Sequence, residues 1–120
     1  MKESELERRF RKLVVQAGGK AYKFVSPGNA GVPDRIVILP GGRVGFVELK
    51  RPGERPGKQQ AVRLSELSGL GCYTAVVDSP ERAETVIDEM MRQVPATHAP
   101  DPLFLEMINR RPAVRKGVVL

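Results

Sequence analysis

Residues 31–50, GVPDRIVILPGGRVGFVELK, contain two short apolar runs, one after the other, with Pro-Gly-Gly between them. Short runs of Val, Ile, Leu and Phe are typical of strands, and a glycine-containing break of this length is typical of a β-hairpin. Each run carries charge at one end: Asp34 begins the first, while Glu48 and Lys50 close the second. Charges at the ends of buried strands cost free energy unless something pairs with them. The hairpin therefore predicts a sheet with acidic groups at one end.

Patterns on both sides of the hairpin predict the other elements. Helical spacing of apolar residues predicts helices over residues 3–17, over residues 58–70 and from Pro80 onward. Apolar runs predict four strands, over residues 21–25, 34–39, 44–50 and 72–77. The strand over 44–50 is apolar on both faces, which predicts a central strand covered on both sides. The order α-β-β-β-α-β-α predicts an α/β fold.

Several residues are assigned to the core of this fold. The closing helix should begin with Ser79 as its cap and Pro80 in its first turn. Its buried face is predicted to comprise Ala83, Val86, Ile87, Met90 and Val94. Tyr22, Phe24 and the thiol of Cys72 are also expected to be buried in or beside strands.

Length and composition limit the class of protein. A chain of 120 residues with 41% hydrophobic residues is long enough for one globular domain. The lone Cys72 excludes an internal disulfide and a cysteine zinc cluster, and it fits a reducing cytosol. No apolar run approaches the roughly 20 residues that a membrane helix needs, and residues 1–12 lack the apolar core of a signal peptide. We therefore expect a cytoplasmic protein with no membrane partner.

Positive charge is concentrated in the first half of the chain. Residues 1–63 contain 14 Lys and Arg against 6 Asp and Glu, whereas residues 64–120 contain 6 against 8. Nucleic-acid phosphate is the natural partner of such a basic half. A solvated basic surface explains the charge equally well, so charge alone does not decide the function.

The acids of the hairpin point to a metal site. Glu48 and Lys50 are two apart on one strand and share a face, and the hairpin brings Asp34 beside the strand end. Two neighbouring carboxylates stay ionised only with a cation between them, and a hard ion such as Mg²⁺ or Mn²⁺ suits oxygen ligands. Lys50 would then hold a water or a phosphate oxygen nearby. The alternative is a structural ion pair, either Glu48–Lys50 or Asp34–Arg35, at a strand end.

The same residues carry a family resemblance. "PD" followed by "ELK" resembles the PD-(D/E)xK nuclease superfamily. The longer string GGKAYKFVSPGNAGVPDRIVILPGGRVGFVELKRPG, with Gln60 ten residues beyond Lys50, resembles the VRR-NUC family of virus-type replication-repair nucleases. The stand-alone phage and prophage members are the most similar. The resemblance covers residues 3–93 and implies a restriction-endonuclease-like αβββαβ core with a mixed central sheet flanked by helices.

The resemblance implies a role for each matching residue. Asp34 and Glu48 would be metal ligands, with the Leu49 backbone carbonyl as a third. Lys50 would orient the attacking water or stabilise negative charge on the phosphate, and Gln60 would turn toward the sheet. The family also has a catalytic glutamate on its first helix. Here Glu7 is our choice because it lies deeper in the helix, and Glu3, one turn earlier, is the alternative.

Other basic residues are candidates for holding DNA phosphates beside the acids. They are predicted to flank the acidic strand ends, and they are Lys20, Lys23, Arg35, Arg51, Arg55 and Lys58. Solvation alone explains any one of them as well.

The predicted organisation is a nuclease domain over residues 1–94 and a C-terminal extension over 95–120. The extension combines a Pro-rich linker with one or two helical turns, and it is predicted to wrap its own domain, to contact a second subunit or partner, or to be disordered.

The predicted function is a Mg²⁺-dependent DNA endonuclease, in which Mn²⁺ can substitute. The resemblance implies branched or flap-like DNA such as a Holliday junction, a homodimer, a bacterial or phage-infected cytosol and a possible replication or repair partner. The alternative is a non-catalytic module of the same fold that binds DNA or a replication partner.

Overall fold

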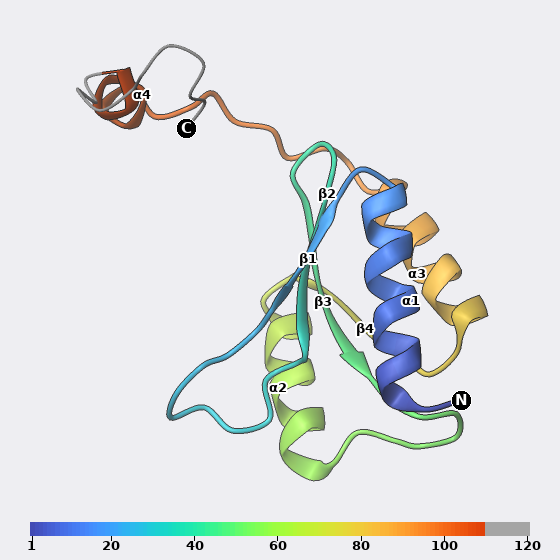
Figure 1. The fold of residues 1–120 in the computed structure, drawn as a ribbon. Coiled ribbons are helices and arrows are strands. Elements are labelled where there is room, and N and C mark those ends of the chain that lie inside the picture. Colours follow the sequence, from blue (N-terminus) through green and yellow to red (C-terminus); the bar gives the residue numbers. More distant parts are fainter. Residues whose placement is uncertain (110–120) are drawn as a thin grey trace.

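A mixed four-stranded sheet forms the middle of the protein, in a computed structural model that describes residues 1–109 (Figure 1). The strands lie in the order β1 (Lys20–Lys23), β2 (Arg35–Leu39), β3 (Arg43–Leu49) and β4 (Tyr73–Val77). The pairs β1–β2 and β2–β3 are antiparallel, whereas β3 and β4 are parallel. The predicted extension is described only as far as residue 109.

Helices cover the two faces of the sheet unequally. Helices α1 (Glu3–Gln16) and α3 (Pro80–Met91) pack side by side on one face, and α2 (Lys58–Gly69) lies on the other (Figure 1). Helix α4 (Pro102–Asn109) stands away from the sheet at the end of an extended linker. The predicted α/β class, with its αβββαβ core and a mixed sheet flanked by helices, is confirmed.

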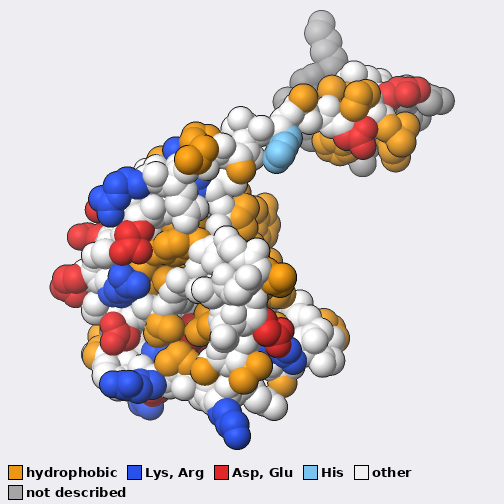
Figure 2. Space-filling model, turned by 180° about the vertical axis from the view of Figure 1, so that it is seen from behind, with side chains coloured by type: hydrophobic (Ala, Val, Ile, Leu, Met, Phe, Trp, Pro, Cys, Tyr) orange, Lys and Arg blue, Asp and Glu red, His pale blue; other side chains and the backbone are white. Residues whose placement is uncertain are grey.

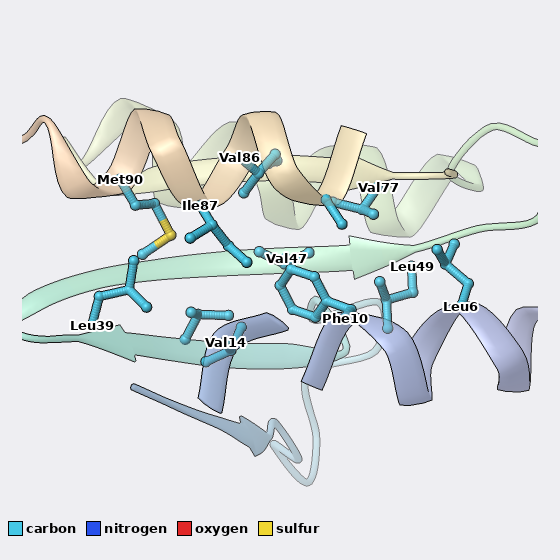
Figure 3. Packing of buried hydrophobic residues seen from close by; sticks show 13 residues of the cluster. Leu6, Phe10, Val14, Leu39, Val47, Leu49, Val77, Val86, Ile87 and Met90 are labelled. Atoms are coloured by element: carbon cyan, nitrogen blue, oxygen red, sulfur yellow. The ribbon is translucent and has the colours of Figure 1, made fainter. Parts of the chain in front are cut away.

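The hydrophobic core lies between the sheet and the pair α1 and α3 (Figure 3). Leu6, Phe10 and Val14 recur every four residues on α1, so they form one stripe, and all three are fully buried. They meet Val47 and Leu49, which point from β3 toward the same face. The core therefore fixes which side chains of β3 point inward, and by alternation it sends Glu48 to the opposite face.

Helix α3 begins as predicted and ends earlier than predicted. The Ser79 hydroxyl accepts a hydrogen bond from the Arg82 N–H at 3.1 Å, and Pro80 occupies the first turn. The assignment of Val94 to the buried face was wrong, because the helix ends at Met91 and Val94 is 87% exposed. The residue before a proline is disfavoured in the helical conformation, and Pro95 follows Val94 directly.

The β2–β3 hairpin sets the register of the sheet. Gly41 and Gly42 have φ angles of +85° and +69°, which residues with a side chain rarely adopt. They reverse the chain between the paired residues Leu39 and Arg43. Because the turn fixes this pair, it also fixes which residues of β2 and β3 face each other at the far end of the hairpin.

The face of the sheet that carries α2 is only partly covered. Strand β3 is central, as predicted, but the expectation of cover on both sides fails in its first half, where Val44 is 42% exposed. Ile38 is 38% exposed and Tyr22 is 47% exposed, so the prediction of a core position for Tyr22 was wrong. Helix α2 packs against β4 and does not reach the residues near the hairpin turn.

Two further core assignments hold only in part. Phe24 is half-buried, and its ring packs against that of Phe46 with 5.6 Å between centroids. Cys72 is half-buried and lies just before β4, whose first residue is Tyr73. Within residues 1–109, no helix has both the length and the apolar composition needed to cross a bilayer.

The core packing generates a stability prediction. Phe10→Ala removes a large, fully buried side chain from the middle of the α1 stripe, so we expect a loss of about 3–5 kcal/mol in the free energy of unfolding. Val15→Ala on the exposed side of the same helix should change it by less than about 0.5 kcal/mol. Urea unfolding followed by circular dichroism measures both, and equal losses would contradict this account of the core.

Candidate active site

Asp34 and Glu48 face each other at the end of the hairpin. Arg35 is paired with Val47 in the antiparallel ladder, so the next pair in register is Asp34 with Glu48. Directly opposed residues of antiparallel strands lie on the same face, with Cβ atoms about 4.5–5.5 Å apart. The structure therefore brings together the two acids that the sequence placed at this end of the sheet.

Asp34 is held by two parts of the backbone. Its Oδ2 accepts a hydrogen bond from the Leu49 N–H at 2.8 Å. Its own carbonyl accepts one from the Phe24 N–H at 2.9 Å, which continues the β1–β2 ladder by one step. The side chain of Asp34 consequently occupies the place beside β3 where a further residue of β2 would pair.

Pro33 explains why no further residue of β2 pairs with β3 at this position. Val47 and Leu49 direct their N–H and C=O groups toward β2, because these groups alternate along a strand. In the register of the hairpin, Leu49 would pair with Pro33, which is buried and has no N–H to donate. The Leu49 carbonyl thus lacks its ladder donor and points to the same side as the Asp34 carboxylate. This geometry is compatible with the role of third oxygen ligand that the family resemblance implies for it, and that role stays a prediction.

Glu48 is the buried member of the pair. It is only 1% exposed, and its Oε1 has no hydrogen-bond partner among the described residues. The pKa of Glu48 is raised to about 7, first by burial and then by the negative charge of Asp34, although the hydrogen bond and positive charge of Lys50 oppose the shift. A buried carboxylate oxygen without a partner indicates a group that binds something else.

Lys50 lies beside Glu48, as the two-residue spacing predicts. Its Nζ is 3.3 Å from Glu48 Oε2 and 3.9 Å from Glu54 Oε1, and its side chain is 13% exposed. Glu54 was not predicted as part of the site. Its four-residue spacing from Lys50 is a contact signal only on a helix, whereas here it arises from the turn of the loop after β3.

The oxygens at this end of the sheet suit a hard divalent cation. Within residues 1–109, no three His, Cys, Asp or Glu side chains are close enough to hold a metal by themselves. The candidate set is instead two carboxylates, Asp34 and Glu48, and the Leu49 carbonyl. Such an all-oxygen set fits Mg²⁺ or Mn²⁺ better than a softer metal.

The structure does not bring Glu7 to this acidic pair. Glu7 forms an ion pair with Arg35 and a longer one, 4.0 Å, with Arg11. Arg35 neighbours Asp34 in the chain but points to the face that α1 covers, opposite to Glu48. Glu3 is exposed in the first turn of α1. A catalytic role for either glutamate stays a prediction.

Arg35, a candidate for holding DNA phosphates, makes contacts within the protein instead. Its side chain is 11% exposed, and it binds both Glu7 and the Ala21 carbonyl. It therefore links α1 to β1 and β2 and has little surface left for a DNA phosphate.

The side chain of Gln60 forms a hydrogen bond at the start of α2. Its Oε1 accepts a hydrogen bond from the Gly57 N–H at 2.9 Å, so the side chain closes the first turn of the helix. No contact described for residues 1–109 joins Gln60 to the acidic pair, and its catalytic role stays a prediction. Gln59 is exposed, as expected from its position.

The remaining basic candidates divide by position. Lys23 pairs with Arg35 in the ladder and so lies near the acidic end, whereas Lys20 pairs with Ile38 near the hairpin turn. The predicted placement of Lys20 beside the acids was therefore wrong. Arg51, Arg55 and Lys58 are exposed in or just after the loop that follows β3, although Arg51 is bound by Glu54.

A broad hollow adjoins the site. It has a volume of about 640 Å³, and its lining includes Glu54, Arg55, Asp78 and Arg82. Val76, which also lines it, is paired with Glu48 in the β3–β4 ladder. Two arginines and two carboxylates thus line this hollow, so its charges balance.

The fold and the acidic strand end define an α/β protein of the restriction-endonuclease-like class. Over 81 residues the chain is 46% identical to "Putative nuclease p44" of Acyrthosiphon pisum secondary endosymbiont phage 1, a match that covers 68% of this chain and 87% of that protein. A solved structure described as a VRR_NUC domain superposes with a TM-score of 0.68 at 28% identity, covering 72% of this chain and 94% of that one. No family profile matches the sequence. The chain belongs to the VRR-NUC family of nucleases, in its phage-type branch.

The burial of Glu48 generates a pH prediction for the metal-free protein. The pKa of Glu48 rises from its ordinary 4.5 to about 7 on folding, so the folded state binds its proton more tightly than the unfolded state. The stability that this proton contributes is complete below pH 4.5 and is lost as the pH rises through about 7. We expect the free energy of unfolding of Glu48→Gln to exceed that of the wild type by roughly 3 kcal/mol at about pH 8, with little difference at about pH 4.

Urea unfolding in EDTA across this pH range measures the difference. Asp88→Asn, which changes an exposed carboxylate on α3, is the matched control and should show no such gain at alkaline pH. A Glu48→Gln gain that is the same at both ends of the range would contradict the assigned pKa.

Proposed function

We propose that this protein is a metal-dependent nuclease that hydrolyses phosphodiester bonds in DNA, with Mg²⁺ as its ion and Mn²⁺ as a substitute. The observation that carries the proposal is the buried Glu48 carboxylate, opposed by Asp34 and left with an unpartnered oxygen. Membership of a nuclease family supports the same activity.

Three groups of this chain would hold the ion: the carboxylates of Asp34 and Glu48 and the carbonyl of Leu49. A divalent ion bound there would supply charge neutralisation at a phosphate and a more acidic water. The protein contributes orientation, because Asp34 is held by the Leu49 N–H and Glu48 is fixed within the sheet. It also excludes solvent, since Glu48 is almost fully buried.

Lys50 is the residue that we propose acts on the substrate. An ammonium group has three donors, and the two neighbouring carboxylates, Glu48 and Glu54, lie 3.3 and 3.9 Å from its Nζ. The Glu54 oxygen lies beyond hydrogen-bond distance, so donors of the ammonium group remain available for a phosphate oxygen or for the attacking water. Positive charge at this position stabilises the negative charge that develops on the phosphate in the transition state.

Phosphates on both sides of the cut would be held by exposed basic side chains near the site. Lys23 approaches from β1, and Arg55 and Lys58 approach from the loop after β3 and the start of α2. None of these contacts needs to read a base, so the proposal is one of backbone recognition.

The finer proposal is that the DNA is branched or flap-like and that the enzyme works as a homodimer. The family resemblance supports a junction substrate, and two symmetric cuts need two active centres. A replication or repair protein as partner is part of the same proposal.

Cleavage of labelled linear, flap and four-way DNA tests the activity. We expect cutting with Mg²⁺ or Mn²⁺ and none with EDTA. Asp34→Ala, Glu48→Gln and Lys50→Ala should each lower the rate by roughly 100-fold or more, because each removes a group that acts in the transition state. Asp88→Asn is the control and should cut at the wild-type rate. Equal cleavage by Asp34→Ala and the wild type would refute the assignment.

Glu7 and Glu3 are separated by a paired measurement of stability and rate. The contact of Glu7 with Arg35 supports a structural role, so we expect Glu7→Gln to lower the free energy of unfolding by about 1 kcal/mol. Its cleavage rate should stay within a few-fold of the wild type while the protein is folded. A rate loss of roughly 100-fold in folded Glu7→Gln, or in Glu3→Gln, would instead identify that residue as the catalytic glutamate.

A further inference from the structure

The loop after β3 begins with a tight turn over residues 51–54, Arg-Pro-Gly-Glu. The Glu54 N–H donates to the Arg51 carbonyl at 2.9 Å, and Gly53 has a φ angle of +79°. Proline at the second position and a glycine with positive φ at the third are typical of a type II turn. The turn reverses the chain, so Glu54 lies back against Arg51.

This turn is anchored to the sheet. The Lys50 N–H, one residue before the turn, donates to the Val77 carbonyl of β4 at 3.0 Å. Across the turn, Arg51 donates to Glu54 Oε2 from two nitrogens, Nε at 3.0 Å and Nη2 at 2.9 Å. Two charge-assisted hydrogen bonds from one guanidinium restrict the orientation of the carboxylate. Glu54 is therefore held at a set position relative to the end of β3, although it belongs to a loop.

The other carboxylate oxygen of Glu54 approaches Lys50. Glu54 Oε1 lies 3.9 Å from Lys50 Nζ, and Glu48 Oε2 lies 3.3 Å from the same nitrogen. The ammonium group thus has one carboxylate neighbour from β3 and another from the turn. In Figure 2, basic and acidic side chains lie together at the lower end of the molecule, where this loop runs in Figure 1.

Glu54 is not a further member of the candidate metal site. Among residues 1–109, no three acidic side chains are close enough to hold a metal, so Glu54 does not complete a set with Asp34 and Glu48. What Glu54 contacts is the ammonium group of Lys50 and the guanidinium of Arg51. Its effect on the site is therefore expected to pass through Lys50.

Lys50 needs a second anion once Glu48 binds a cation. The side chain of lysine is a flexible chain, and only 13% of that of Lys50 is exposed, so neighbouring protein groups decide where its ammonium group lies. With a divalent ion bound to Glu48, Lys50 would lose much of the attraction of that carboxylate and would also be repelled by the ion. Glu54 keeps its full negative charge in that state, because it is outside the ligand set.

We infer that Glu54 is a positioning residue, which holds the ammonium group of Lys50 beside the acidic pair while Arg51 holds Glu54 in place. Arg51, a candidate for binding a DNA phosphate, is thereby assigned a role inside the protein. The inference rests on the proposed function, because it concerns the residue that we propose acts on the substrate.

Cleavage kinetics of a double-mutant cycle test whether Glu54 acts through Lys50. We expect Glu54→Gln to lower kcat by roughly 10-fold and to leave KM within about two-fold, which is the size of effect expected for a partner of a catalytic group. In a Lys50→Ala background the same substitution should have no further effect, because the group that Glu54 positions is absent. An unchanged kcat in Glu54→Gln, or an equal loss in both backgrounds, would overturn the inference.

Glu66→Gln is the matched control for this cycle. Glu66 also pairs with an arginine three residues earlier in the chain, Arg63, at 2.8 Å, but it lies on α2 and makes no described contact with Lys50. It should cut at the wild-type rate.

Arg51→Gln tests the other half of the inference. Glu54 remains but is no longer held, so kcat should fall by about three-fold, less than in Glu54→Gln, with KM nearly unchanged. A raised KM at constant kcat would show that Arg51 binds a DNA phosphate, and would overturn its assignment to Glu54.

The position of Lys50 in crystals soaked with manganese provides a readout independent of cleavage. We expect Lys50 Nζ to stay within about 4 Å of Glu54 in the wild type and to leave the acidic pair in Glu54→Gln. Wild-type crystals with Lys50 in this place but no cleavage of any DNA would count against the proposed function alone. An identical Lys50 position in Glu54→Gln, in an enzyme that does cleave, would overturn the positioning role alone.

Discussion

The carboxylate of Glu48 lies almost wholly out of water and directly opposite the carboxylate of Asp34. Two negative charges in such a place are unfavourable unless a proton or a cation is shared between them, and the raised pKa of Glu48 expresses that cost. The sheet imposes the arrangement, because the hairpin turn fixes the register and the core fixes which way Val47 and Leu49 point. The stability of the fold thus holds together a pair of groups that are unfavourable without a ligand.

Pro33 connects the local sequence to this chemistry. A residue with an N–H at that position would extend the β2–β3 ladder and engage the Leu49 carbonyl. With proline there, the ladder stops, the Asp34 carboxylate accepts a hydrogen bond from the Leu49 N–H, and the Leu49 carbonyl is left without a ladder donor on the β2 side. A Pro-Asp pair opposite a Glu-x-Lys strand end therefore has a physical reason, beyond its value as a family signature.

The sequence predicted the parts of the structure that depend on local pattern. Apolar periodicity located the helices and strands within a few residues, and strand alternation placed Glu48 beside Lys50. Prediction from the sequence failed for the features that depend on contacts between distant parts of the chain. The pairing of Glu7 with Arg35 requires knowing how α1 crosses the sheet, and the exposure of Val44 requires knowing how far α2 extends. Glu54 reaches Lys50 through a loop whose path no spacing rule describes.

Manganese soaked into a crystal of this protein tests the central claim most directly, because its anomalous scattering locates the ion without reference to activity. The account predicts one site at which the carboxylate oxygens of Asp34 and Glu48 and the carbonyl oxygen of Leu49 lie about 2.1 Å from the ion. It also predicts that the site is lost in Asp34→Ala crystals. Manganese bound elsewhere, with the Asp34–Glu48 pair left vacant at saturating concentration, would contradict it.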